Sequence, residues 1–323
     1  MPSRKLGFAV KVVGEPGLPS HDTRRWQSKP HLSVSLSRVR KILDYLARVR
    51  IGMYRLSSAL VPYGTHPDLP EFHRQVEECA AQLAELGAYA NELGMRLSSH
   101  PGQYVVLNSA SEKVSEAAAR DLELQARLFD AMGLGPDAVV VLHVGSGEGG
   151  HEAGKLRFLR AIERLSERAL GRLVIENDDR VFSLAHMLEI SDRTGLRVVL
   201  DVLHHHCNDP DGVSDREALR LALATWPREQ TPKIHYSSPK TAIEERPAKR
   251  RRQLERSLAL PQLRAHADMI DPLAFEWFLA GPARGLSFDI MLEAKAKDAA
   301  LLRLREQLAA RGIPTHGGAL QAP

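Results

Sequence analysis

Short apolar runs rich in Val, Ile and Leu alternate with longer stretches of helical periodicity along nearly the whole chain, and this alternation limits the fold more than any other feature. Runs such as 139–144 (VVVLHV) are apolar apart from one histidine and do not alternate with polar residues, which is typical of parallel strands buried on both faces. Eight strands are predicted in this way, at Leu6–Val10, Gly52–Leu56, Arg96–Ser99, Ala138–Val144, Arg172–Glu176, Arg197–Leu203, Lys233–Tyr236 and Leu286–Leu292. Eight helices are predicted after them, at about 36–48, 71–93, 112–132, 152–169, 183–194, 214–224, 272–280 and 296–311.

Eight β/α units in 323 residues predict an α/β fold, a (β/α)8 TIM barrel formed as a single domain over residues 1–311. An open, doubly wound sheet is the alternative. No Gly-rich dinucleotide fingerprint follows the first predicted strand, which disfavours that alternative and predicts that no nucleotide cofactor is used. Residues 312–323 are expected to form a flexible C-terminal tail.

The composition predicts a soluble, cytoplasmic protein. With 43% hydrophobic residues the chain can bury a core, but no stretch approaches the roughly 18–20 uninterrupted apolar residues of a membrane span. Two cysteines, Cys79 and Cys207, are too few for a disulfide scaffold or a thiolate metal site, and they fit a reducing compartment. We therefore expect no membrane partner.

Positive charge is concentrated in one segment. The chain has 44 Lys+Arg against 40 Asp+Glu, a net charge of +4, whereas the segment 239–265 alone has eight basic and three acidic residues. This basic insert and the long connection 14–35, with Arg24, Arg25 and Trp26, follow predicted strands, so in a barrel they lie on the face of the catalytic loops. They suit a large anionic substrate, although an arginine run is equally typical of a solvated helix face.

Ionisable side chains stand at the ends of six consecutive predicted strands, the third to the eighth. The carboxyl ends of barrel strands meet at one axial site, so these groups are expected to converge. An apolar core has no use for them, because each costs several kcal/mol to bury unpaired. They are His100, His143, Glu176, Asp201 with His204 shortly after it, His235 and Glu293, and His266 and Asp268 lie nearby in the sequence.

Divalent metal ions would neutralise such a set together. Imidazole and carboxylate ligands in mixture suit zinc or manganese, and the lack of cysteine ligands favours a hydrolytic site over a structural zinc. With three or four ligands for each ion, the set accommodates two or three metals, and Glu176 is well placed to bridge two of them. Clustered ions stabilise the attacking and leaving oxygens of a phosphoryl displacement, so phosphodiester hydrolysis is the reaction class expected.

Single histidines need a more cautious interpretation, because one histidine at a strand end is more often structural than a ligand. Within the run 204–206, His204 is favoured as a ligand and His206 remains an alternative. The histidines expected to have no part in the site are His73, His151, His186, His205 and His206.

Lys233 stands two residues before His235, so both side chains face the same side of the seventh strand. If that side is the barrel interior, Lys233 lies near the metals with a depressed pKa or with a modified amine. A phosphate contact is the simpler alternative.

Several motifs resemble the UV damage endonuclease family, metal-dependent (β/α)8 barrels related to endonuclease IV. The resemblance covers about 290 residues, and the SHPGQY and LDVLHHH elements together are its most specific part. The motifs are YRLSSALVPYGTHP (54–67), SSHPGQYVVLNS (98–109), LHVG (142–145), VIENDD (174–179), LDVLHHHCN (200–208), KIHYSS (233–238), HADMID (266–271) and DIMLEAKAKD (289–298).

The resemblance implies a DNA repair nuclease that cuts double-stranded DNA on the 5′ side of a bulky lesion, such as a pyrimidine dimer, and leaves a 3′ hydroxyl. Manganese is the metal that it implies, and Glu176, Lys233 and Glu293 are the catalytic residues expected. The implied ligand sets are His100, His143 and Glu176 for one ion, Glu176, Asp201, His235 and Glu293 for a second, and His204 and His266, with Asp268, for a third.

Gln103 and Tyr104 match family residues that push into the duplex behind the extruded lesion. Unstacking a lesion costs a few kcal/mol, and a stacking wedge offsets part of this cost. The chain departs from the family at Phe8 and Val12, where a tyrosine and an asparagine are usual near the lesion, so Phe8 is expected to contact the lesion without a hydroxyl. The insert 239–265 is also longer and more basic than the family needs, and is interpreted as a clamp on the phosphate backbone.

Two other functions remain as alternatives. A xylose-isomerase-like sugar isomerase or epimerase shares the barrel and the strand-end carboxylates, but the surplus of ligands and the basic loops disfavour it. A non-catalytic DNA-binding protein with a structural metal is disfavoured because such metals are held in closed cages of four ligands. The protein is expected to act as a monomer.

Overall fold

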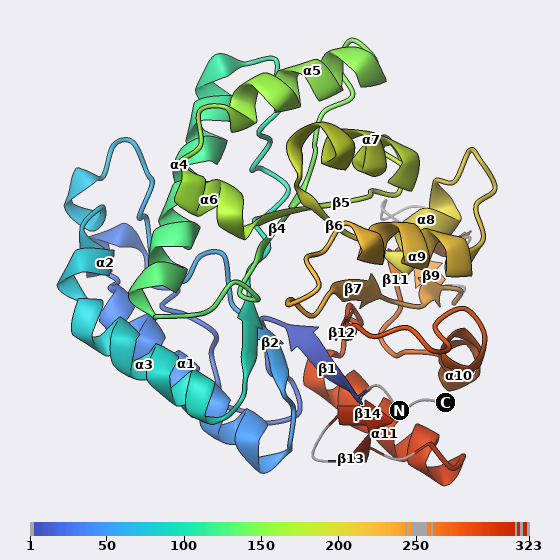
Figure 1. Ribbon diagram of the computed structural model, residues 1–323. Coiled ribbons are helices and arrows are strands. Elements are labelled where there is room, and N and C mark those ends of the chain that lie inside the picture. Colours follow the sequence, from blue (N-terminus) through green and yellow to red (C-terminus); the bar gives the residue numbers. More distant parts are fainter. Residues whose placement is uncertain are drawn as a thin grey trace.

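The computed structural model describes residues 3–242, 244–246, 257–259, 261–313, 315–316 and 319–321. Eight parallel strands lie at its centre with helices around them, which confirms the predicted (β/α)8 barrel (Figure 1). All eight predicted strands are present, most of them shorter than expected. They are β1 (Ser3–Ala9), β2 (Met53–Arg55), β3 (Arg96–Ser98), β4 (Val140–His143), β5 (Leu173–Glu176), β6 (Arg197–Val199), β7 (Lys233–Tyr236) and β12 (Asp289–Leu292).

Two arcs of strands make up the barrel. One arc pairs β3, β2, β1, β12 and β7 in that order, and the other pairs β4, β5 and β6, all in parallel. Isolated parallel bridges join the arcs at both seams, Ser99 to Val140 and Asp201 to His235. The sheet is therefore closed, and two candidate metal ligands form one of its seams.

Helices cover the outside of the barrel in sequence order. In α1 the buried residues, such as Leu32, Leu36, Val39 and Leu43, recur every three to four positions, so one apolar stripe packs on the barrel while the other side meets solvent. The helices are α1 (Leu32–Arg48), α2 (Gln75–Glu78), α3 (Ala80–Glu92), α4 (Glu112–Ala131), α5 (His151–Ile162), α6 (Glu167–Arg172), α7 (Leu184–Thr194), α8 (Val202–Cys207), α9 (Asp215–Ala224), α10 (Pro272–Ala280) and α11 (Lys297–Ala310), with 3-10 turns at Trp26–Ser28 and Pro70–Phe72.

Three predicted elements differ from the structure. The helix expected over 71–93 is divided into a 3-10 turn, α2 and α3, and the helix expected over 152–169 is divided into α5 and α6. Ser166 begins α6, because its side chain accepts a hydrogen bond from the backbone N–H of Ala169. The sixth strand was expected to run to Leu203, but it ends at Val199 and Val202–Cys207 forms helix α8.

The long segment after β7 contains short strands outside the barrel. β8 (Pro239–Lys240) pairs with β11 (Gln262–His266), and β9 (Glu244–Arg246) pairs with β10 (Ser257–Ala259). The arginine run of the basic insert, residues 249–252, lies outside the described residues, so the clamp interpretation stays a prediction. Within 312–323, where a tail was expected, β13 (Thr315–His316) pairs with β14 (Ala319–Gln321), and β14 pairs with β1.

Alternate residues of the strands build the barrel interior in layers. Val139, Val141, Val174 and Val199 form an apolar cluster with Trp226. Side chains two positions apart on a strand point to the same side. The side to which these valines point is therefore also that of the residues two positions further on, His143, Glu176 and Asp201. The apolar layer therefore supports a polar layer at the carboxyl end of the barrel. Among the described residues, no helix is long and apolar enough to span a membrane.

Candidate metal centre

Glu176 lies at the centre of the polar layer. Its side chain is fully buried at the end of β5. Its Oε2 atom is 2.9 Å from His100 Nε2 and 3.6 Å from His143 Nε2, and its Oε1 atom is 2.5 Å from His235 Nδ1. The two carboxylate oxygens thus face imidazoles from different strands, which is the arrangement that a bridging carboxylate requires.

Three groups of residues bring ligand atoms within 4.8 Å of one another, the spacing of a metal site. Glu176 belongs to two of them and Asp201 to two, so the groups adjoin. The groups are His100, His143 and Glu176; Glu176, Asp201 and His235; and Asp201, His204 and His266. The first group is the ligand set expected for one ion. The other two groups both contain Asp201, which the sequence predicted as a ligand of the second ion alone.

Glu293 and His266 lie at the edge of this cluster. Glu293 follows β12, and its Oε1 atom is 3.4 Å from His235 Nδ1. Its Oε2 atom is 3.7 Å from His266 Nδ1. The structure therefore brings together all eight residues predicted as metal ligands. Asp268 is exposed and belongs to none of the three groups.

Helix α8 explains how His204 reaches the cluster. Asp201 caps α8, because its Oδ1 atom accepts a hydrogen bond of 2.8 Å from the backbone N–H of His204. Asn177, fully buried, pairs with the backbone of Asp201 through both its amide nitrogen and its oxygen, at 3.0 and 2.9 Å. The first turn of the helix therefore brings His204 Nδ1 to 3.8 Å from Asp201 Oδ2.

The helix also separates the three consecutive histidines. His205 Nε2 lies 2.8 Å from the Val213 carbonyl oxygen, and His206 Nε2 lies 2.8 Å from Asp215 Oδ1. These contacts turn both rings to partners outside the cluster. Of the run 204–206, the candidate centre includes only His204 among the residues that the structure describes.

The charges of the cluster shift its pKa values strongly. Burial alone would raise the pKa of Glu176, but the imidazoles of His235 and His143 lower it well below its ordinary value. Burial lowers the pKa of His204, but Asp201, Glu176 and Glu293 outweigh it and raise that pKa to about 9. The carboxylates thus create a strongly negative site that attracts positive charge.

One buried atom of the cluster fits a metal ion in particular. Within the described part of the chain, nothing hydrogen-bonds Asp201 Oδ2, although this atom is buried. Buried polar atoms are seldom left without partners, so an unpaired carboxylate oxygen beside imidazoles suits a cation as its partner. The set consists of imidazole nitrogens and carboxylate oxygens, the donors that divalent ions of hydrolytic sites take.

Sequence reasoning missed Arg55. It ends β2, is buried, and its Nη2 atom lies 2.5 Å from Glu293 Oε1 and 2.8 Å from His235 Nε2. The pattern that predicts the site consists of His, Asp and Glu at strand ends, whereas the second strand supplies a cation. Its position at a strand end, inside the motif 54–67, was the available signal.

Lys233 lies in the barrel interior, below the cluster. It is fully buried, and its Nζ atom donates a hydrogen bond of 3.0 Å to Ser98 Oγ. Burial, together with Arg55 and Arg96, lowers the pKa of Lys233 well below its ordinary value. The expected orientation and depressed pKa agree with the structure, whereas the modified amine stays a hypothesis.

The residues expected to contact the lesion lie in two different environments. Gln103 and Tyr104 are exposed on the loop after β3, and Tyr104 is 85% exposed. A large aromatic side chain so exposed beside the cluster suits a stacking role. Phe8, by contrast, is fully buried in β1 and packs edge-on against Tyr54 at 5.4 Å between ring centroids. Phe8 therefore belongs to the barrel core, and we leave it out of the proposed DNA interface.

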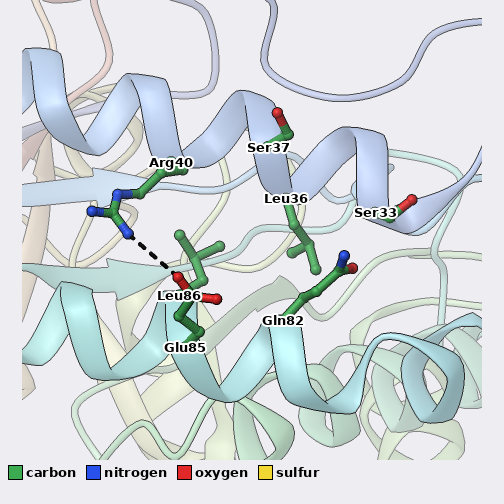
Figure 2. Close-up of a pocket in the computed structure, with 7 residues that line it drawn as sticks. All are labelled: Ser33, Leu36, Ser37, Arg40, Gln82, Glu85 and Leu86. Carbon is green, nitrogen blue, oxygen red and sulfur yellow. Dashed lines mark ion pairs between the residues drawn. The ribbon is translucent and has the colours of Figure 1, made fainter.

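The groove between α1 and α3 is a different kind of site (Figure 2). It has a volume of about 200 Å³ and is lined by serines, leucines, Gln82 and the Arg40–Glu85 ion pair. None of the candidate metal ligands lines it. The chemistry of the molecule is concentrated at the barrel mouth instead.

Comparisons with known proteins agree with this geometry. The profile of the family described as UV-endonuclease UvdE matches residues 22–320. The chain belongs to this family. It is 30% identical over 291 residues to a UV DNA damage endonuclease of Bacillus velezensis, an alignment that covers 88% of this chain and 83% of that protein. The crystal structure of SacUVDE matches with a TM-score of 0.77 and 30% identity, over 96% of this chain and 99% of that chain.

Membership of the UvdE family makes the chain a DNA repair endonuclease. Sugar epimerases share only the fold: the structure of an L-ribulose 3-epimerase has a TM-score of 0.54 at 14% identity, over 96% of this chain and 86% of that chain. The sugar isomerase or epimerase considered from the sequence is therefore not favoured.

Proposed function

We propose that the protein hydrolyses the phosphodiester bond on the 5′ side of UV photoproducts and other helix-distorting lesions in double-stranded DNA, acting as a cytoplasmic monomer with two or three bound divalent ions. The observation that carries this proposal is the cluster of eight candidate ligand side chains around the buried carboxylate of Glu176, which is itself one of the eight. The names of the relatives in the UvdE family support the substrate.

We assign the metal ligands as follows. His100, His143 and Glu176 would hold one ion, Glu176, Asp201, His235 and Glu293 would hold a second, and Asp201, His204 and His266 would hold a third. Manganese is the proposed metal, and zinc is the alternative for the same donors. Bound ions of this kind supply hydroxide near neutral pH and neutralise the charge that develops on the leaving oxygen.

The protein side chains organise this chemistry. Arg55 holds the Glu293 carboxylate by an ion pair, which fixes one ligand before any metal binds. Lys233 fills the space below the cluster and excludes water from the barrel interior. With Glu176 and Glu293 it forms the proposed catalytic group.

Lesion recognition is assigned to the loop after β3. Tyr104 stacks on a base in the gap left by the extruded lesion, and Gln103 hydrogen-bonds the exposed base edges opposite. Because unstacking costs least where damage has already weakened pairing, such a wedge selects for deformability of the duplex rather than for base sequence.

The proposal is tested with purified, manganese-loaded protein, an irradiated duplex and a duplex that carries an abasic site. We expect nicks 5′ to the photoproducts, mapped by strand-specific end labels, and loss of cutting with EDTA. Turnover of a free sugar without cleavage of either duplex would refute the proposal and favour an isomerase. Parallel reactions with zinc identify the metal.

A further inference from the structure

Two adjacent serines, Ser237 and Ser238, follow β7 directly and are buried to nearly the same extent, at 5% and 7% exposure. Their hydroxyl groups differ in their partners. The Ser238 Oγ atom accepts a hydrogen bond of 2.8 Å from the backbone N–H of Asp271, which caps α10. The Ser237 Oγ atom is buried and has no hydrogen-bond partner among the residues that the structure describes. Such atoms are rare in folded proteins, so this hydroxyl requires an explanation.

The pairing of β7 with β12 shows which way Ser237 faces. The register ends at Tyr236, whose carbonyl oxygen accepts a hydrogen bond of 2.9 Å from the Glu293 N–H, so Ser237 and Glu293 form the next row. Ser237 also lies two positions beyond His235, and its side chain therefore points to the same side of the strand, the barrel interior. Ser238 points the other way, toward α10.

Candidate metal ligands lie around this position. Glu293 stands beside Ser237 in the sheet, and its carboxylate lies 3.7 Å from His266 Nδ1. The segment that carries His266 crosses here, because the N–H of the following Ala267 donates a hydrogen bond of 2.9 Å to the Ser238 carbonyl oxygen. Ser237 therefore lies where the ligand sets proposed for the second and third ions meet.

The Ser237 hydroxyl can act here as a neutral hydrogen-bond donor. A serine offers one O–H donor, whereas the side chains of Glu293, His235 and His266 would direct their lone pairs to metal ions. A buried donor without an acceptor destabilises the fold, so a donor kept at such a place suits an acceptor that arrives with the substrate. A phosphodiester provides charged non-bridging oxygens, and an uncharged donor binds one of them without repelling the ions.

We propose that the Ser237 hydroxyl donates a hydrogen bond to a non-bridging oxygen of the DNA phosphate that is cut. This inference rests on the proposed nuclease function and adds to it a residue that contacts the substrate directly. The hydrogen bond orients the phosphate at the junction of the second and third ligand sets. Because the acceptor oxygen is charged, this bond is stronger than one to a neutral acceptor.

The first test is calorimetric titration of the manganese-loaded protein with inorganic phosphate, which needs no cutting. We expect Ser237→Ala to weaken phosphate binding by about tenfold, with an unchanged manganese content, because the hydroxyl contacts the phosphate and not an ion. Ser237→Thr, which keeps the hydroxyl, should bind within about threefold of wild type, and Ser238→Ala should bind as wild type does. Wild-type affinity in Ser237→Ala, or equal weakening in Ser237→Ala and Ser237→Thr, would overturn the proposal.

Melting temperatures separate a contact with the substrate from a structural role. In protein without phosphate or DNA, Ser237→Ala removes a buried hydroxyl that lacks a partner, so this variant should melt about 2 °C above wild type. Ser238→Ala leaves the Asp271 N–H without its acceptor and should melt about 2 °C below wild type. A Ser237→Ala protein that melts as far below wild type as Ser238→Ala would contradict the proposal, because its hydroxyl would then stabilise the fold.

Cutting of irradiated duplex completes the test. Ser237→Ala should lower kcat/KM by about 30-fold, whereas Ser238→Ala should change it by less than about twofold. A wild-type protein that cuts, with an equal kcat/KM in Ser237→Ala, would overturn the role of Ser237. A wild-type protein that binds phosphate through Ser237 but cuts no duplex would overturn the nuclease function and leave the phosphate contact in place, so the two proposals fail separately.

Discussion

A single buried carboxylate organises the candidate centre, so its replacement is the sharpest change at the scale of one residue. Glu176→Gln keeps the size of the side chain but removes the charge that the surrounding imidazoles stabilise. We expect the rate of cutting to fall by about 10³-fold or more, with DNA binding kept, because a neutral amide is a poor bridging ligand. Single-turnover kinetics with irradiated duplex measures this change.

The control for this variant is Glu163→Gln, which makes the same substitution at an exposed glutamate after α5. It should cut at the wild-type rate. Retained cutting by Glu176→Gln, with normal metal content, would contradict the bridging role.

The residues of the candidate site could be predicted from the sequence because their types are unusual in an apolar core. Histidines and acids at strand ends have no place in an apolar interior, so their sequence positions alone indicated a shared site. Arg55 gave a weaker signal, its position at a strand end, because an arginine there more often reaches solvent. Its role follows from the Arg55–Glu293 contact, which joins residues far apart in the chain and is visible only once the barrel is closed.

Away from the site, the ionisation of Asp121 in α4 is expected to affect the free energy of unfolding. Burial raises its pKa to about 6, although a hydrogen bond of 2.9 Å from Gln125 opposes this. Because the pKa is higher in the folded protein than in the unfolded chain, ionisation of Asp121 destabilises the fold as the pH rises toward and above 6. Asp121→Asn should therefore increase the free energy of unfolding by about 1–2 kcal/mol at pH ~7.5.

Urea denaturation of both proteins at pH ~7.5 and ~4.5 checks this prediction. The advantage of Asp121→Asn should shrink at the lower pH, where the folded wild type holds Asp121 protonated. An equal difference at both pH values would mean that the charge of Asp121 is not the cause.

At the scale of elements, the sequence predicted every barrel strand, but it joined helices that the structure divides in two places and misplaced the end of the sixth strand. The run 197–203 (RVVLDVL) is mostly apolar, and a buried helix turn has the same apolar character as a buried strand. The end of β6 is decided by Asp201, which caps α8, and by Asn177, which binds the Asp201 backbone from the neighbouring strand end. That contact joins residues 24 positions apart, so no local pattern contains it.

The loop after β3 allows a separate prediction, because an exposed residue at its tip can be substituted with little effect on the fold. Tyr104 is 85% exposed, so Tyr104→Ala should alter the free energy of unfolding by less than about 0.5 kcal/mol. The loss of a stacking side chain should nevertheless lower the preference for irradiated over undamaged duplex by about tenfold. Competition binding with the two duplexes measures the preference, and Tyr104→Phe, which keeps the ring, should retain it. An unchanged preference in Tyr104→Ala would argue against the wedge.

For the whole molecule, we expect metal binding to stabilise the closed barrel. The bridge between Asp201 and His235 joins the arc of β4, β5 and β6 to the rest of the sheet, and both residues are candidate ligands of one ion. That ion would hold the seam together, and without it the buried carboxylates repel one another across the seam. A ligand that binds only the folded state adds about 4 kcal/mol of stability at a thousandfold excess over its Kd.

Removal of metal should therefore lower the melting temperature of the whole domain. For a domain of this size, about 4 kcal/mol corresponds to a fall of roughly 8–16 °C. Scanning calorimetry of EDTA-treated protein, before and after manganese is restored, measures this fall and its reversal. The Glu176→Gln variant should lose less than wild type, because it binds the ions more weakly from the start. An identical melting temperature with and without metal in the wild type would show that the seam is stable without ions and that the cluster does not bind them tightly.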